Sequence, residues 1–169
     1  LAFAKVIDAK SPFTSGHSER VAVFTDLIAE GLGETPATRR MLRRAALLHD
    51  VGKLGISNTI LDKPGKLTDA EFAEIKKHPV HSGDILSGIA AFADIATIGR
   101  DHHEKLDGSG YPHGLKADQI SRHTRIVTTA DIFDALTADR PYRKAMPTSQ
   151  ALAILEGDVG TALDADCFA

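Results

Sequence analysis

The chain has one cysteine and no tryptophan among its 169 residues, and only 5% of its residues are aromatic. The single cysteine, Cys167, excludes an internal disulfide and cannot build a thiolate metal cluster alone. This fits a reducing compartment, so we expect a cytoplasmic protein. Because aromatic residues are scarce, alanine and leucine must supply much of the interior, which favours helices over strands.

Strong charge and long apolar runs are also missing. The net charge of -3 provides no overall basic field for duplex nucleic acid. No apolar run approaches the roughly 20 residues that a membrane span needs, and no signal peptide is visible. We therefore expect this domain to contact neither membranes nor duplex nucleic acid, and its length suits one domain with its own core.

Hydrophobic residues recur at three- and four-residue spacing along most of the chain, the pattern of amphipathic helices. Ser15 is expected to cap the helix that follows it, and Thr68 with Glu71 has the pattern of a capping box. The fold class predicted is all-α, a helical bundle. The predicted helices cover residues 1–10, 17–32, 37–51, 69–77, 79–87, 92–105, 124–138 and 149–156.

Five of the eight histidines stand in positions that indicate metal ligands. Two doublets, His49–Asp50 and His102–His103, fall on separate predicted helices. Adjacent helical residues point about 100° apart, so a doublet can reach one metal only near a helix end or in a bundle interior. Asp131 is an acid inside a helix of apolar and small residues, where carboxylates are rarely buried without a partner. The predicted metal-binding set is His17, His49, Asp50, His78, His102, His103 and Asp131.

This set has the size of a dinuclear site. With Asp50 shared, seven side chains fill about eight of the roughly twelve positions around two octahedral ions. Imidazole-rich donors favour iron, manganese, zinc, cobalt or nickel over calcium or magnesium. Lys53 lies on the same face as His49 and can offer a cation to a bound phosphate. The alternative is that each histidine is an ordinary surface or core residue, as we interpret His81, His113 and His123.

Longer stretches of the chain are similar to one known family. They include "GHSERVA" (16–22), "LLHDVGKLGI" (47–56), "KKHPVHSGDIL" (76–86), "DHHEKLDGSGYPHGLKADQI" (101–120) and "RIVTTADIFDALTADRPYRKAMP" (125–147). With them the chain resembles the HD-GYP family of bacterial phosphodiesterases, within the HD superfamily of helical metallohydrolases. The GYP triplet is Gly110-Tyr111-Pro112. The resemblance implies an HD-type helical bundle with a dinuclear metal site in its core. It also implies that residues 1–169 form one HD-GYP-like domain, taken from a longer chain with an upstream sensory or receiver region.

The activity that this resemblance implies is hydrolysis of cyclic di-GMP, a bacterial second messenger, to the linear dinucleotide pGpG and in some members to GMP. Two divalent metal ions are implied, with iron or manganese expected first and zinc, cobalt or nickel as further choices. Lys53 is implied to contact the scissile phosphate beside Asp50, and Arg140 and Arg143 to bind substrate. The ligands implied for one metal are His17, His49, Asp50 and Asp131, and for the other Asp50, His78, His102 and His103.

Some neighbouring positions carry further expectations. Members with a third metal have a glutamate where this chain has Phe13, so we expect two metals. The loop around Tyr111 is expected to wall the substrate groove, to contact a diguanylate cyclase domain, or to be a stiff structural turn. Glu104 is expected to orient a ligand histidine or to face solvent. Asp134 is expected either to relay a proton or to be a helix-face acid, and we favour the helix-face acid. A homodimer is a further expectation from the family.

Two alternatives to this enzyme stay open. One is another HD-superfamily hydrolase acting on nucleotides, which a substrate panel would identify. The other is a catalytically silent module that binds cyclic di-GMP or a protein partner, which binding measured beside turnover would identify.

Overall fold

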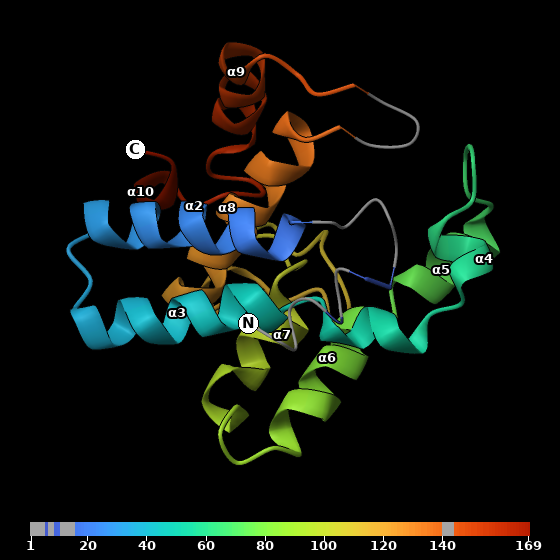
Figure 1. Ribbon diagram of the computed structural model, residues 1–169. Helices are drawn as coiled ribbons and strands as arrows, with labels where there is room; N and C mark the ends of the chain where they lie inside the picture. Colours follow the sequence, from blue (N-terminus) through green and yellow to red (C-terminus); the bar gives the residue numbers. More distant parts are fainter. Residues whose placement is uncertain (1–5, 7–8, 11–15, 140–143) are drawn as a thin grey trace.

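The computed structural model describes residues 6, 9–10, 16–139 and 144–169 (Figure 1). Along these ranges every regular element is a helix, so the all-α prediction is confirmed. The α-helices are α2 (His17–Gly31), α3 (Pro36–Leu48), α4 (Asn58–Leu61), α5 (Asp69–Ile75), α6 (His78–Ser87), α7 (Ala96–Asp101), α8 (Arg122–Thr137), α9 (Thr148–Asp158) and α10 (Ala165–Phe168). Three short 3-10 helices are η1 (Val51–Gly55), η2 (Ala93–Ile95) and η3 (Ala117–Gln119).

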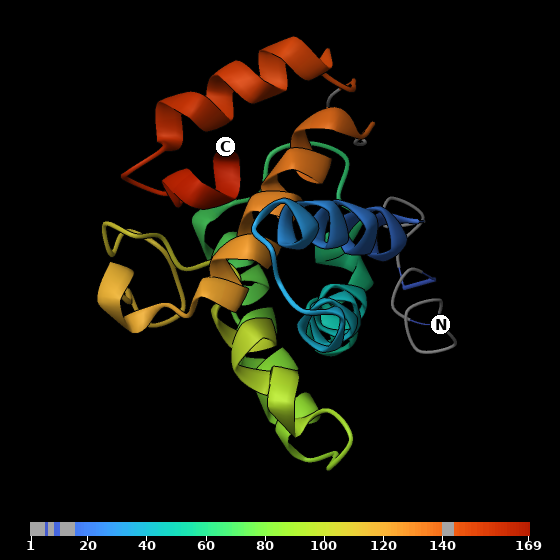
Figure 2. The same ribbon diagram turned by 90° about the vertical axis from the view of Figure 1, so that its left-hand side faces the viewer.

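The helices pack around α8. The α2–α3 hairpin lies along one side of it, and α6 pairs with α7 below (Figures 1 and 2). Helices α9 and α10 cover α8 on the side away from α6, whereas α4 and α5 project from the body. Because α2 and α3 run in opposite directions, the start of α2 and the end of α3 lie at the same end of the hairpin. This arrangement brings His17 close to His49.

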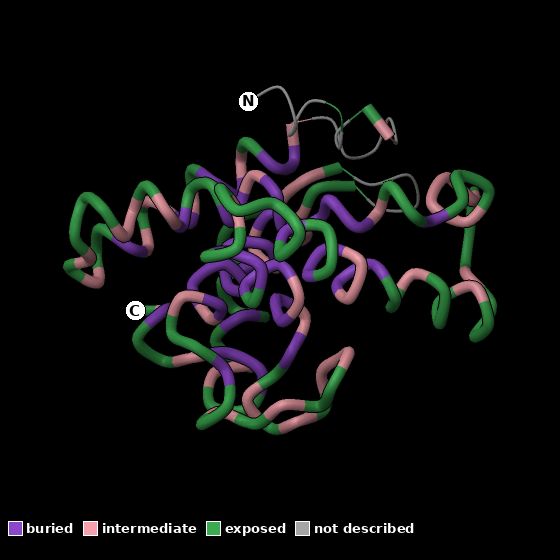
Figure 3. Tube along the Cα trace, turned by 90° about the horizontal axis from the view of Figure 1, so that it is seen from below, coloured by how far each residue is buried: buried purple, intermediate pink, exposed green. Residues whose placement is uncertain are grey.

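Burial is concentrated where these helices meet (Figure 3). The main hydrophobic cluster includes residues of α3, α6, η2, α7 and α8, and its larger members are Leu42, Leu86, Ile95, Ile126 and Val127. A run of buried polar residues lies within the same interior, and it includes most of the predicted metal ligands. No helix formed by the described residues is long and apolar enough to cross a membrane.

Local signals explain several helix starts. Thr35 caps α3 by accepting a hydrogen bond from the Thr38 N–H, and the Thr68–Glu71 capping box predicted for α5 is confirmed. Gly16, in the left-handed region with φ 69°, occupies the position before α2. The cap expected from Ser15 lies outside the described residues, as does most of the helix expected over 1–10.

Two predicted helices are shorter than their periodicity indicated. The helix expected over 37–51 ends at Leu48, and the one expected over 92–105 is divided into η2 and α7, which ends at Asp101. Both ligand doublets therefore follow a helix end, and the placement of His49–Asp50 and of His102–His103 within helices was wrong. The reason lies in how each helix is terminated, which also orients the histidines.

Candidate metal centre

The structure brings all seven predicted ligand side chains into one buried cluster, with Asp50 at its centre. One oxygen of Asp50, Oδ2, lies 3.5 Å from His17 Nε2 and 3.4 Å from His49 Nε2. The other, Oδ1, lies 3.1 Å from His78 Nε2 and 3.8 Å from His102 Nε2. The carboxylate therefore faces two separate histidine pairs, which is the geometry required of a bridging ligand.

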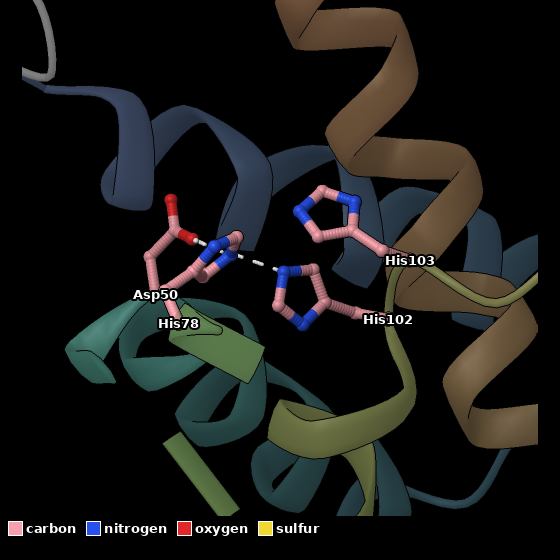
Figure 4. A group of neighbouring side chains, drawn as sticks. All are labelled: Asp50, His78, His102 and His103. Carbon is pink, nitrogen blue, oxygen red and sulfur yellow. Dashed lines mark ion pairs between the residues drawn. The ribbon is translucent and has the colours of Figure 1, made fainter. Parts of the chain in front are cut away.

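The cluster divides into two groups that share Asp50. In the second group, Asp50, His78, His102 and His103 have ligand atoms within 4.8 Å of one another and point toward a common centre (Figure 4). In the first group, Asp131 Oδ1 lies 3.4 Å from His17 Nε2 and 3.8 Å from His49 Nε2. A third set of close ligand atoms, from His49, His102 and Asp131, joins the two groups. The division into two metal subsites that the resemblance implies therefore stays a prediction.

Three of the histidines are oriented by the same local contact. Each follows the end of a helix and donates from Nδ1 to a carbonyl in its last turn, an acceptor that lacks a helical partner. Because Nδ1 holds the proton, the lone pair of Nε2 points into the cluster and is free to bind a cation. The contacts are His49 to the Ala46 carbonyl at 2.7 Å, His78 to Ile75 at 2.7 Å, and His102 to Gly99 at 2.8 Å.

His17 is oriented by a carboxylate instead. Its Nδ1 lies 2.7 Å from Asp134 Oδ2, and Arg20 donates to both oxygens of Asp134 at 2.5 and 3.0 Å. The Asp134 side chain is only 1% exposed, so its interpretation as a helix-face acid was wrong. Asp134 stands three residues after Asp131, and this spacing, which places both on one face of α8, was the sequence signal for its role.

Unpaired buried atoms show that these residues fit a metal. Four ligand atoms are buried without a hydrogen-bond partner among the described residues: His49 Nε2, Asp50 Oδ1, His78 Nε2 and His102 Nε2. Leaving one such atom unsatisfied costs about 1–3 kcal/mol. The three nitrogens converge on the Asp50 carboxylate, and imidazole with carboxylate is a donor set suited to divalent transition metals.

The protonation of the histidines differs between the two groups. Burial opposes the ionised form of Asp50, but Lys53 and His49 outweigh it and hold the pKa of that carboxyl well below its usual range. Burial likewise lowers the pKa of His17, but hydrogen bonds to Asp134 and Asp50 raise it to about 9. In the second group burial lowers the pKa of His103 to about 3, and burial with the neighbouring His103 lowers that of His102. The metal-free domain therefore holds a proton on His17 near neutral pH, whereas His102 and His103 are neutral.

Metal binding is consequently expected to release a proton from His17. A metal must displace that proton, so affinity for the subsite containing His17 should rise between about pH 6.5 and about pH 8.5. Calorimetric titration of Mn²⁺ in two buffers of different ionisation heat measures the protons released. An affinity at this subsite that is independent of pH over that range would contradict the assignment.

Lys53 lies at the edge of the cluster on η1. Its Nζ is 2.5 Å from Asp50 Oδ2, and its side chain is 21% exposed. Gly52 lets η1 pack against α6, because a Cβ there would lie 2.5 Å from Ser82 N and closer still to the His78 carbonyl. The ammonium is thus placed between the buried carboxylate and solvent.

The loop of residues 108–115, which contains Gly108, Gly110 and Gly114, packs against the segment that carries His102 and His103. Glu104, buried beneath it, accepts hydrogen bonds from the N–H groups of His113 at 2.7 Å and Leu115 at 2.9 Å. Glu104 therefore neither orients a ligand histidine nor faces solvent, and both expectations for it were wrong. It holds the loop in place.

Gly110→Ala is expected to destabilise the domain by more than about 2 kcal/mol. A Cβ at Gly110 would lie 2.5 Å from Glu104 Cα and 2.6 Å from the His103 carbonyl oxygen, where backbone must shift to make room. Gly157→Ala on α9 is the matched control, because nothing lies within 4 Å of its added methyl. The control should be stabilised by about 0.5–1 kcal/mol in denaturant unfolding. Equal stability of the two variants would contradict the close approach.

The remaining sequence predictions have different outcomes. Arg140, Arg143 and Phe13 lie outside the described residues, so their roles stay predictions. His113 is exposed as expected, whereas His81 and His123 are partly buried.

Comparison with known proteins places this site in context. A family profile described as HD domain matches residues 2–167. The chain is 60% identical over 168 residues to 3′3′-cGAMP-specific phosphodiesterase 3 of Vibrio cholerae, covering 99% of this chain and 36% of that protein. It is 42% identical to the cyclic di-GMP phosphodiesterase response regulator RpfG of Xanthomonas campestris, covering 97% of this chain and 44% of that protein. The chain thus spans less than half the length of either relative.

Solved structures agree with this placement. A cyclic GMP-AMP-specific phosphodiesterase of Vibrio cholerae aligns with a TM-score of 0.60 and 53% identity, covering 99% of this chain and 37% of that one. An HD-GYP-type protein of Bdellovibrio bacteriovorus shares the fold with a TM-score of 0.75 at 23% identity, covering 94% of this chain and 50% of that one. The similarity to HD-GYP proteins inferred from the motifs is confirmed.

Proposed function

This chain belongs to the HD domain family, and from that premise we propose that it is the hydrolytic domain of a cyclic dinucleotide phosphodiesterase. The observation that carries the proposal is the position of Asp50, whose two oxygens face two separate groups of buried imidazole nitrogens. Relatives at 60% and 42% identity are named as phosphodiesterases of cyclic dinucleotides.

The chain's own residues have distinct tasks in this proposal. Two divalent metals, iron or manganese first among the candidates, supply Lewis acidity for phosphate oxygens and acidify a water. His17, His49, Asp50 and Asp131 hold one of them, and Asp50, His78, His102 and His103 hold the other. Helix-end contacts keep the imidazoles of His49, His78 and His102 in place, so little reorganisation of these three accompanies binding.

Lys53 binds the substrate phosphate. Its ammonium already contacts the shared carboxylate at 2.5 Å, and metals bound there would compete for that oxygen and free the ammonium. The freed ammonium would then bind a phosphate oxygen of the substrate. Arg140 and Arg143 are proposed to bind the second phosphate or a base, on the sequence pattern alone.

Two substrates are candidates. The motifs point to cyclic di-GMP, with pGpG as the first product and GMP as a further one. The relative at 60% identity and a solved structure at 53% are both named as specific for cyclic GMP-AMP. We propose 3′3′-cGAMP as the preferred substrate, with cyclic di-GMP hydrolysed more slowly.

Turnover of the two cyclic dinucleotides by the metal-loaded protein, followed chromatographically, tests this proposal. The expected result is linear dinucleotide from both, with the larger kcat/KM for 3′3′-cGAMP. Hydrolysis of nucleoside monophosphates but of neither cyclic dinucleotide would indicate a different HD hydrolase. Tight binding of either substrate without turnover would indicate a silent binding module. The cyclase partner, the homodimer and the cytoplasmic location stay predictions.

A further inference from the structure

His103 differs from the other ligand histidines in how its ring is held. His17, His49, His78 and His102 each have Nδ1 anchored by a carboxylate or a carbonyl. Within the described part of the chain, no residue makes a hydrogen bond to either ring nitrogen of His103. An imidazole on an unanchored side chain samples several ring orientations, and fixing it costs side-chain entropy when metal binds. Ring contacts orient this ligand instead, since the rings of His102, His78 and Tyr111 lie 4.1, 5.0 and 4.8 Å from its own. Of these three neighbours, Tyr111 is the one that is not itself a predicted ligand.

The Tyr111 ring lies against His103. Their ring centroids are 4.8 Å apart and their planes are 28° from parallel, a stacked arrangement. Lys76 Nζ lies over the Tyr111 ring at 5.4 Å and over the Phe72 ring at 4.7 Å. Stacking of two rings contributes about 0.5–1.5 kcal/mol beyond the area that it buries. The contact restricts rotation of the His103 ring about its Cβ–Cγ bond.

The position of the Tyr111 ring is fixed through the backbone of its loop. The Tyr111 N–H donates to the His103 carbonyl at 3.2 Å, which ties the two residues together. Gly110 lies against the same segment without room for a side chain. Glu104 anchors the far side of the loop through the N–H groups of His113 and Leu115. The loop thus holds an aromatic ring against a metal ligand.

We propose that Tyr111 is a positioning residue for His103 and acts through the face of its ring. The inference rests on the proposed dinuclear site and assigns a task to the tyrosine of the GYP triplet. Because stacking needs the ring alone, phenylalanine at this position retains the function. A side chain of similar reach without a ring does not retain it. The effect is confined to the subsite formed by Asp50, His78, His102 and His103.

Co²⁺ titration of the metal-free domain tests the proposal, with binding followed by the visible absorption of the bound ion and by calorimetry. Tyr111→Leu should weaken one of the two binding steps by about tenfold, the lower end of the range for losing a contact that orients a ligand. Tyr111→Phe should bind both ions as the wild type does. Phe72→Leu is the matched control. It removes the other ring that Lys76 lies over. Phe72 is 45% exposed, and its ring makes no contact with His103.

The possible results distinguish a failure of the role proposed for Tyr111 from a failure of the dinuclear site. The unchanged binding step reports that Tyr111→Leu is folded, so a weakening of one step alone supports the proposal. Two wild-type steps in Tyr111→Leu would overturn it and leave the dinuclear site standing. Equal losses in Tyr111→Phe and Tyr111→Leu would also overturn it, because the hydroxyl would then be the group required. A wild-type domain that binds no Co²⁺ would overturn the dinuclear site and this inference together.

Discussion

Asp50→Asn is expected to lower cyclic dinucleotide turnover by about 10²–10³-fold, the scale for losing a principal electrostatic contributor to catalysis. The side chain keeps its shape but loses the negative charge that both histidine groups face. An amide oxygen binds a divalent cation more weakly than a carboxylate, and its NH₂ group cannot bind one at all. Elemental analysis after desalting should find both metals depleted.

Asp84→Asn is the matched control for this change. Asp84 is exposed on α6, so removing its charge should leave metal content and turnover as in the wild type. An Asp50→Asn variant that retains two metals per chain would contradict the bridging role. Full turnover by that variant would contradict the catalytic role as well.

Asp134→Asn is expected to weaken metal binding at the subsite of His17 by about 10–100-fold, the range for partners that orient a ligand histidine. Asp134 accepts from His17 Nδ1 at 2.7 Å and from Arg20 at 2.5 and 3.0 Å. An asparagine offers only one acceptor oxygen for these donors, so the His17 ring loses its fixed tautomer or Arg20 loses its partner. Mn²⁺ titration should show one weakened step and one unchanged step.

Asp118→Asn, on the exposed 3-10 helix η3, controls for the loss of one negative charge. It should leave both binding steps unchanged. Equal weakening of both steps in Asp134→Asn would show a general loss of packing rather than a role for Asp134 at His17. Unchanged binding in both steps would show that His17 needs no carboxylate to orient it.

That these seven side chains lie together was predictable, because histidine doublets and buried acids have few other uses. Two histidine-containing doublets and an acid inside an apolar helix indicate a metal without any knowledge of their positions. The residues at which the neighbouring helices end were less predictable. Periodicity carries the helices past Leu48 and Asp101, but the contacts of His49 and His102 with the last-turn carbonyls mark both as helix ends. No hydrophobic pattern encodes such a side-chain contact.

Contacts between distant segments account for the other errors. Glu104 binds N–H groups nine and eleven residues away, in a loop whose path depends on the whole fold. Asp134 was a different case, because its three-residue spacing from Asp131 already placed both on one face of a helix. The face that binds the metal was predictable there, and the error came from treating a polar residue on it as solvent-exposed.

The central claim is a dinuclear metal centre that hydrolyses cyclic dinucleotides, and one measurement tests it most directly. The protein is purified under reducing, anaerobic conditions without added metal. Bound metal per chain is then measured on the sample used for 3′3′-cGAMP turnover. The account predicts about two iron or manganese ions per chain, as two octahedral subsites require, together with turnover. The absence of stoichiometric metal, even after reconstitution, would contradict it.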